Sequence, residues 1–359
     1  MLLKDLFVFL PKSKRSASYG KLEGKYPFFT SSNTINKYVD EPDYNGSYLI
    51  IGDGGTGNCK YYDGEFSASD HNYIMFPKKG TNPHCVQYFL AKDNFQVLNE
   101  GFKGIGIKNV SKAYIENIDY RHNQKFSEDY ICQTLVKIEE LINKELSVLT
   151  LLDELTKSRF IEMFRPIQYM YDSDYSIGDV CEVNPKKDSL DDNIEITFIP
   201  MEKVGTDGSL KLDSLRKYGD IKKGFSQIKE NDVLFAKITP CMENGKATIA
   251  KGLINGYAGG TTELFVIRCG DKVLPEYLFH IVHSQYFRDK AKPNMRGTVG
   301  QQRVGKDFIE SFHIDVPDLK RQKEFSIFVK QVDKLKFNAQ KRIDLYQELL
   351  NKKMDEYFN

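Results

Sequence analysis

One stretch of this chain, residues 128–164, reads EDYICQTLVKIEELINKELSVLTLLDELTKSRFIEMF, and a second copy of its pattern closes the chain at residues 322–358. In the first copy, apolar residues recur mostly at steps of three and four, which is the spacing of an amphipathic helix. They are Ile131, Leu135, Ile138, Leu141, Ile142, Leu149, Leu152 and Leu155. The second copy repeats the spacing with Phe325, Val329, Val332, Leu335, Ala339, Ile343, Tyr346 and Leu350. We therefore expect two matched long helices whose apolar stripes are packing seams.

The repeat extends beyond these two helices. A constant offset of 194 holds without a gap through Gly106/Gly300, Val110/Val304, Lys112/Lys306, Ile115/Ile309, Glu116/Glu310, Leu141/Leu335, Leu151/Leu345, Glu154/Glu348, Leu155/Leu349, Glu162/Glu356 and Phe164/Phe358. The starts of the two halves also correspond, because KDLFVFLPK from Lys4 resembles GDVCEVNPK from Gly178. The chain thus consists of a globular region, a helix, a longer globular region and a helix.

Composition limits the classes of protein to which the chain can belong. Its 359 residues, with 24 Phe and 21 Tyr, can fill the cores of two domains. A net charge of +1 provides no global attraction for nucleic acid or an acidic membrane, so local clusters must meet any anionic partner. The apolar run Leu6–Leu10 is too short for a signal peptide, and no stretch approaches the roughly 20 apolar residues of a membrane span. We expect a cytoplasmic protein.

Neither the cysteines nor the glycine-rich turn predicts a bound cofactor or metal. The six cysteines never form a Cys-x-x-Cys motif and lack nearby paired histidines, so we expect free thiols rather than zinc ligands or disulfides. The turn at residues 52–57, GDGGTG, is followed by neither Gly-Lys-Ser/Thr nor a helix pattern, so it matches neither a P-loop nor a dinucleotide fingerprint. It is either a tight turn or a bare backbone that comes close to a ligand such as a DNA backbone.

The second globular region carries denser polar motifs. Residues 233–246, VLFAKITPCMENGK, run from a buried-type strand into a polar turn, and residues 259–267, GGTTELFVI, combine a polar turn with a strand. Residues 295–303, MRGTVGQQR, place two Arg, two Gln and a Thr on a loop made flexible by glycine. Arg and Gln can make bidentate contacts with the edges of guanine and adenine. These loops are therefore either solvated turns or base-reading segments.

Several of these stretches resemble the DNA-specificity subunit of Type I restriction-modification systems, and the resemblance covers essentially the whole chain. The matching stretches are residues 28–32 (FFTSS), 49–57 (LIIGDGGTG), 68–72 (ASDHN), 235–246 (FAKITPCMENGK) and 297–304 (GTVGQQRV), together with Pro317 and Gln322 at the entry to the last helix. The first half departs from this pattern at its helix entry, where Asn123 and Glu128 stand in the equivalent positions.

The resemblance implies an α+β fold in which two mixed α/β target-recognition domains are separated by two long antiparallel helices, with a pseudo-twofold internal repeat. We expect the first domain over residues 1–125, the first spacer helix over 126–165, the second domain over 166–320 and the second spacer helix over 321–359. About 37 residues at roughly 1.5 Å each give a spacer of about 55 Å. The implied partners are double-stranded DNA with a bipartite target, two methyltransferase subunits, and restriction subunits with ATP-driven translocation.

The same resemblance implies that polar residues of both regions line a DNA-facing surface. In the first region we expect these to be Ser31, Ser32, Asn33, Asp53, Thr56, Asp70 and Asn72. In the second region we expect Lys237, Thr239, Asn244, Arg296, Thr298, Gln301, Gln302 and Arg303.

No arrangement of residues in the sequence predicts catalysis. The Asn-Pro pairs at Asn82 and Asn184 lack the aromatic residue of a methyltransferase motif, and no convincing carboxylate cluster for Mg²⁺ stands out. We therefore expect a DNA reader and scaffold without its own catalytic site. Two alternatives remain open, namely a stand-alone DNA methylase or nuclease fragment, and a purely structural coiled-coil protein.

Overall fold

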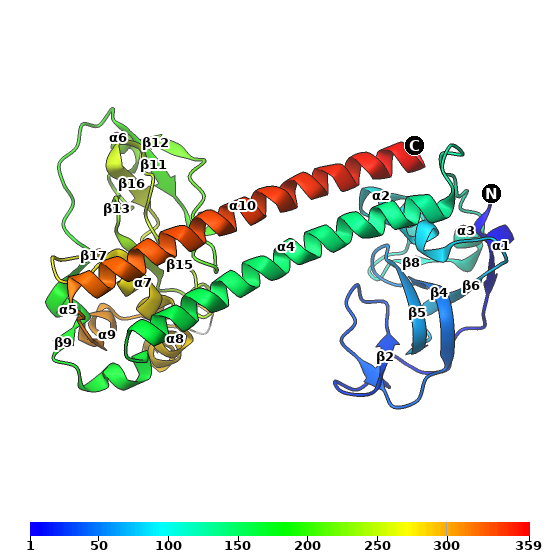
Figure 1. The fold of residues 1–359 in the computed structure, drawn as a ribbon, viewed down its shortest axis with the longest axis horizontal. Coiled ribbons are helices and arrows are strands. Elements are labelled where there is room, and N and C mark those ends of the chain that lie inside the picture. The colour runs from blue at the N-terminus through cyan, green and yellow to red at the C-terminus, as the bar shows by residue number, and fades with distance from the viewer. Residues whose placement is uncertain (299) are drawn as a thin grey trace. The chain divides into compact units, whose positions relative to one another are not determined.

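The computed structural model describes residues 1–298 and 300–359, so Val299, within the predicted base-reading loop, lies outside the described residues. The chain forms two compact units. Unit 1 contains Met1–Ser147 and Ala339–Asn359, and unit 2 contains Val148–Asn338. Each unit therefore combines one globular region with the adjoining parts of both long helices (Figure 1).

Unit 1 is built around a six-stranded sheet with the strand order β1-β6-β4-β5-β2-β3. Its elements are α1 (Leu3–Leu6), β1 (Phe7–Phe9), β2 (Tyr26–Phe29), β3 (Tyr38–Val39), β4 (Tyr44–Gly52), β5 (Cys59–Ala68), β6 (Asn72–Pro77), α2 (Pro83–Asn99), β7 (Phe102–Lys103), β8 (Asn109–Val110) and α3 (Lys112–Glu116). The first long helix, α4, follows over Glu128–Met163. The pairing is antiparallel except between β2 and β5, which run parallel.

Unit 2 contains two four-stranded sheets, β10-β17-β14-β15 and β12-β11-β16-β13. Its elements are η1 (Ile167–Asp172), β9 (Tyr175–Ser176), α5 (Ile177–Val180), β10 (Cys181–Val183), β11 (Glu195–Ile199), η2 (Met201–Lys203), β12 (Leu215–Lys217), α6 (Tyr218–Ile221), β13 (Ser226–Lys229), β14 (Val233–Ala236), β15 (Ala247–Ile249), η3 (Ile254–Gly256), β16 (Tyr257–Gly260), β17 (Leu264–Cys269), α7 (Pro275–His283), α8 (Gln285–Ala291), η4 (Lys292–Asn294), β18 (Met295–Arg296), β19 (Arg303–Val304), α9 (Lys306–Ser311) and β20 (His313–Ile314). The second long helix, α10, spans Leu319–Phe358.

The structure confirms the internal repeat. The strand order β1-β6-β4-β5 in unit 1 recurs as β10-β17-β14-β15 in unit 2. Helix α1 begins at Leu3 and α5 at Ile177, which is the offset found at the starts of the halves, whereas α3 at Lys112 and α9 at Lys306 follow the second offset. The sheet β12-β11-β16-β13 continues the repeat, because β11 runs parallel to β16 and antiparallel to β12, as β2 runs parallel to β5 and antiparallel to β3.

Each globular region packs its core against both long helices. In unit 1, Ile131 and Leu135 of α4 and Tyr357 of α10 belong to the same buried cluster as Leu49 of β4 and Val86 of α2. In unit 2, Phe160 of α4 and Phe325 of α10 belong to the cluster that contains Phe235 and Ile267, and their ring centroids are 5.5 Å apart. The start of α4 thus meets the end of α10 in unit 1, and the converse holds in unit 2. The helices are antiparallel, as expected.

The apolar stripes are only partly packing seams, which corrects the expectation from sequence. Ile131, Leu135, Phe325 and Val329 are buried, but leucines further along both helices are exposed. In unit 1 these include Leu141, Leu345 and Leu349, and in unit 2 they include Leu335, Leu151 and Leu155. The two sets are related by the offset of the repeat, so each unit exposes the same three leucines.

The entry to each long helix is fixed by a polar side chain that contacts the helix following the sheet. Gln322 is fully buried and accepts a hydrogen bond from the Leu274 amide at 2.8 Å, while its own amide donates to the carbonyls of Lys272 and Pro317. At the equivalent place in unit 1, the Glu128 carboxylate accepts from the Asn82 amide at 2.8 Å. The acceptor is preserved between the halves, whereas a carboxylate has no N–H to donate.

The two helices also start differently, as the sequence departure at Asn123 indicated. Asp318 caps α10 by accepting from the Arg321 amide at 3.0 Å, and α10 therefore begins three residues before Gln322. In unit 1, the Ser127 hydroxyl accepts from the Tyr130 amide at 3.2 Å, and α4 begins at Glu128.

Replacing Gln322 with Leu is expected to destabilise the protein by about 3 kcal/mol or more. The change leaves one buried N–H and two carbonyls without this partner, and each unsatisfied group costs about 1–3 kcal/mol. Gln331→Leu, the same change at an exposed position of α10, should alter stability by less than about 0.5 kcal/mol. Urea unfolding measures the stability of both variants. Equal midpoints for the two variants would contradict the assigned role of Gln322.

Candidate nucleic-acid interface

Two polar loops of unit 2 are held side by side by backbone hydrogen bonds. The loop after β14 contains Lys237 and Thr239, and the hairpin β18–β19 contains Gln302 and Arg303. The Thr239 amide donates to the Gln302 carbonyl at 3.0 Å, and the Val304 amide donates to the Lys237 carbonyl at 2.9 Å. The Gln302 amide also donates to the Thr239 hydroxyl at 3.1 Å. Four of the predicted site residues therefore form one continuous strip.

Arg303 is engaged within this strip. Its guanidinium forms a fork with the Glu263 carboxylate, with nitrogen–oxygen distances of 2.9 to 3.1 Å, and it also donates to the Gln301 carbonyl at 3.0 Å. Hydrogen bonds from Arg303 hold the pKa of Glu263 below its usual range, so the carboxylate stays charged. Arg303 therefore orders the hairpin against β17, and a base could engage it only in competition with Glu263.

The remaining predicted residues of unit 2 are exposed. The Arg296 side chain is 81% exposed, and its ion pair with Asp307 spans 3.3 Å between two solvated groups, an arrangement that contributes little stability. Thr298 and Gln301 are exposed on the same hairpin, and Asn244 is exposed on the neighbouring loop. These side chains remain accessible to an external partner.

The predicted residues of unit 1 lie on loops joined by a buried residue that we did not nominate, Asn58. Its amide donates to the carbonyls of Ser31 at 3.0 Å and Thr56 at 3.1 Å, and the Ser31 hydroxyl donates to the His71 carbonyl at 2.6 Å. The Ser31–Asn33 segment, the glycine-rich turn and the segment before β6 are thereby brought together. Ser32, Asn33 and Thr56 are exposed there.

Two predicted residues of unit 1, Asn72 and Asp53, instead hold the loops in place. Asn72 is fully buried, and its amide donates to the Phe29 carbonyl at 3.1 Å. Asp53 is buried between Lys12 and His71. One carboxylate oxygen of Asp70 is buried without a hydrogen-bond partner. The structure does not present Asn72 to an external partner, and Asp53 already pairs with Lys12 and His71.

The glycine-rich turn and the Lys237 loop occupy the same place in the repeat. In unit 1, the Gly55 amide donates to the Lys108 carbonyl at 2.9 Å, and the Val110 amide donates to the Asp53 carbonyl at 2.9 Å. These bonds match those of Thr239 with Gln302 and of Val304 with Lys237. The turn is therefore a strand-like edge that pairs with the hairpin β7–β8. This pairing explains the conformation of its backbone, and no bound phosphate is needed to explain it.

Sequence reasoning missed the hairpin β7–β8 itself. Gly104 and Gly106 have φ values of +143° and +85°, close to the +128° and +82° of Gly297 and Gly300 in the hairpin β18–β19. A Cβ on Gly104 would lie 2.8 Å from the Ile107 carbonyl oxygen, and one on Gly297 would lie 2.8 Å from that of Gln301. The offset that pairs Gly106 with Gly300 could have identified this hairpin as the first region's counterpart.

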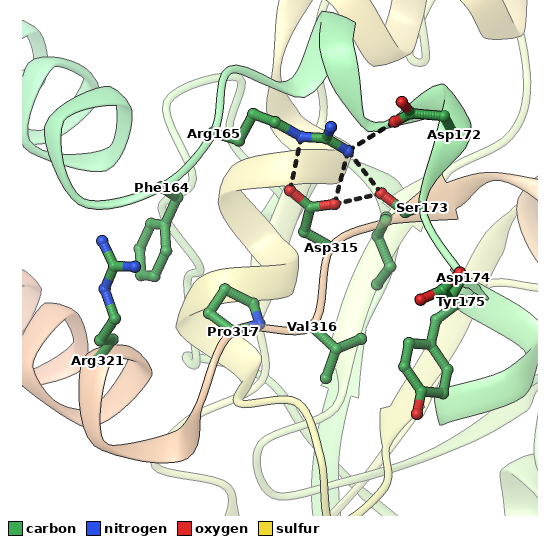
Figure 2. A pocket seen from close by; sticks show the side chains of 11 residues that line it. Phe164, Arg165, Asp172, Ser173, Asp174, Tyr175, Asp315, Val316, Pro317 and Arg321 are labelled. Atoms are coloured by element: carbon green, nitrogen blue, oxygen red, sulfur yellow. Dashed lines mark hydrogen bonds and ion pairs between the residues drawn. The ribbon is translucent and has the colours of Figure 1, made fainter.

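A separate polar cavity of about 560 Å³ lies in unit 2 where α4 ends and α10 begins. Figure 2 shows Arg165 forming a fork with Asp315 at 2.8 and 2.9 Å and reaching Asp172 and Ser173. These bonds with Asp315 raise the pKa of Arg165. The cluster ties the segment after α4 to the residue two positions before Pro317, and we assign it a structural role.

The part of the chain that the structure describes holds no group of three or more His, Cys, Asp and Glu side chains placed to bind a metal ion. All six cysteines have free thiols. None of the helices within residues 1–298 and 300–359 combines the length and the apolar character needed to cross a membrane.

The family model for the Type I restriction modification DNA specificity domain matches residues 1–119 and 173–347, so this chain belongs to that family. The Type I restriction enzyme EcoAI specificity subunit of Escherichia coli is 39% identical over 178 residues, which cover 48% of this chain and 30% of that protein. The EcoEI specificity subunit of the same organism is 34% identical over 182 residues, covering 49% and 30%. The matched stretches thus span less than a third of these relatives.

A solved structure supports the fold over the whole chain. The S subunit of the Type I restriction-modification system from M. genitalium superposes with a TM-score of 0.65, covering 100% of this chain and 95% of that one at 11% identity.

Proposed function

We propose that this chain is the DNA-reading subunit of a Type I restriction-modification complex, in which each globular region reads one half of a bipartite target. The observation that carries this proposal is the repeated pairing of a polar edge with a glycine-kinked hairpin, once in each half of the chain. Phosphate contacts position a protein on DNA, whereas side chains at base edges specify the sequence. Exposed Arg296 and Gln301 can form hydrogen bonds with base edges, and Lys237 can form an ion pair with a phosphate.

A scaffolding role is supported by the exposed leucines of the long helices. A soluble helix normally turns its leucines towards a core, so a repeated exposed set favours a partner. Leu141, Leu345 and Leu349 of unit 1 correspond to Leu335, Leu151 and Leu155 of unit 2. Two copies of one surface suit two copies of one partner, and we assign them to two methyltransferase subunits. Restriction subunits complete the proposed complex.

The chain acts in this proposal without a catalytic site of its own. Incubating the pure chain with a labelled methyl donor and DNA, and separately with Mg²⁺ and DNA, tests this directly. We expect neither methyl transfer nor cleavage. Turnover by the pure chain would favour the alternative of a stand-alone methylase or nuclease fragment.

Replacing Arg296 or Gln301 with Ala should weaken binding to the target by about 1–3 kcal/mol and relax the choice of base in the second half-site. Lys237→Ala should instead weaken binding to all sequences alike and lower the salt dependence by about one counterion. Fluorescence anisotropy with variant half-sites separates the two effects. If Arg296→Ala and Gln301→Ala leave both affinity and preference unchanged, the hairpin is purely structural.

A further inference from the structure

The tip of the hairpin β7–β8 exposes two large apolar side chains. Ile105 is fully exposed, and Ile107 is 77% exposed. The adjacent Lys103 and Lys108 are also exposed. Isoleucine is among the residue types most often buried, so two exposed isoleucines in the five residues between β7 and β8 are unusual.

The tip is anchored by backbone pairing at its base. Lys103 pairs with Asn109 across the hairpin, and Asn109 pairs in turn with Gly54. The positive φ of Gly104 and Gly106 and the close approach of Gly104 to the Ile107 carbonyl fix the turn. The hairpin therefore presents its isoleucines from the edge that carries the glycine-rich turn, next to the candidate interface.

Charge and the internal repeat indicate what the tip contacts. Residues 102–110, FKGIGIKNV, contain two lysines and no acidic residue, which suits an anionic partner. At the offset of 194, Val299 and Gln301 stand at the positions of Ile105 and Ile107. The second region thus has a polar side chain, Gln301, where the first region has Ile107.

We propose that Ile105 and Ile107 make an apolar contact with the bases of the first half-site, while Lys103 and Lys108 hold the flanking phosphates. This inference rests on the proposed function. The shared chemistry is an apolar base surface, which is either a thymine methyl group in the major groove or the face of a base at an opened step. The first half-site is then read largely by shape and apolar contact, and the second by hydrogen bonds.

The test compares the wild-type chain in its methyltransferase complex with the double variant Ile105→Ser, Ile107→Ser. Full burial of one Ile is worth about one to two decades in affinity, so loss of both should weaken binding by about a hundredfold or more. The salt dependence should not change, because no phosphate contact is lost. Discrimination within the second half-site should also persist. The matched control Lys103→Ala, Lys108→Ala should lower the salt dependence by about two counterions instead.

Two modified duplexes identify the base surface. If thymine methyl groups are contacted, deoxyuridine in the first half-site weakens wild-type binding and has no further effect on the double variant. If a base step is opened, 2-aminopurine at that step brightens with the wild type and not with the double variant. Either result supports the inference, and the absence of both overturns it.

Unchanged affinity and preference in the double variant would overturn the inference while leaving the proposed function standing. Loss of the methyltransferase subunits with normal DNA binding would also overturn it, because the tip would then be a protein contact. A wild-type complex without any sequence preference would overturn the proposed function, and the inference with it. The isoleucines are mostly exposed in the free chain, so the urea-unfolding midpoint of the double variant should be close to that of the wild type.

Discussion

A chimaera whose residues 1–120 come from the first domain of a different specificity subunit should recognise a target with one new half and one unchanged half. Each mismatched base pair costs about 1–3 kcal/mol, so three altered pairs should lower binding to the original target by roughly a hundredfold or more. The reason is that the hairpin-and-edge pair of unit 1 is complete within residues 1–120. Selection from a randomised DNA library reads out both halves.

The junction has to preserve the contacts that unit 1 makes with the long helices. The Asn123 amide donates to the Tyr357 carbonyl at 2.7 Å, and Ile131 and Leu135 pack into the core of the first region. A foreign domain must therefore present an apolar face to α4 and to the end of α10. An unfolding midpoint near that of the wild type serves as the control. A chimaera that folds normally but changes both halves of the target would show that the regions do not read independently.

Inserting one heptad after Leu141 and the same heptad after Leu335 should abolish binding to the original target. Both insertions are needed because the antiparallel helices must keep their register. Each adds about 10 Å to a helix, which corresponds to about three base pairs. Three pairs turn the duplex by roughly 100°, so twist opposes the gain in length. Residual binding should favour a spacer longer by a few pairs, at lower affinity.

A heptad inserted after Leu141 alone is the matched control. It lengthens α4 alone, so α4 and α10 can no longer pack together in both cores, and it should lower the unfolding midpoint. The paired insertion should recover much of that stability. A doubly extended variant that kept full preference for the parental spacing would mean that something other than these helices sets the distance.

Much of the fold was predictable because the repeat is written in the sequence. The two offsets located α1 against α5 and α3 against α9, and the apolar period located α4 and α10. The exposure of the Leu141 side chain was not predictable. Periodicity shows that a helix has an apolar face, but it does not show whether the same chain covers that face. The helix entries were predictable only in part, because Asp318 and Ser127 act through caps whose geometry depends on the turn before them.

The site was predictable as a set of loops but not residue by residue. Asn72 and Gln301 are both amides in polar segments, yet Asn72 satisfies buried carbonyls and Gln301 is exposed. Sequence alone does not distinguish these environments. We expected Arg303 to read bases, but its guanidinium pairs with Glu263, which lies in the polar stretch at residues 259–267. The sequence did not single out the tip with Ile105 and Ile107, because these side chains are apolar, although the offset of the repeat includes Gly106.

Genome-wide mapping of methylated adenines, in cells with and without this chain, tests the central claim most directly. A DNA-reading subunit without its own catalytic site should be required for methylation at one bipartite motif and for no other methylation. Restoring the chain should restore that motif, and the chimaera should replace one half of it. Methylation of the same motif in cells that lack the chain would contradict the account.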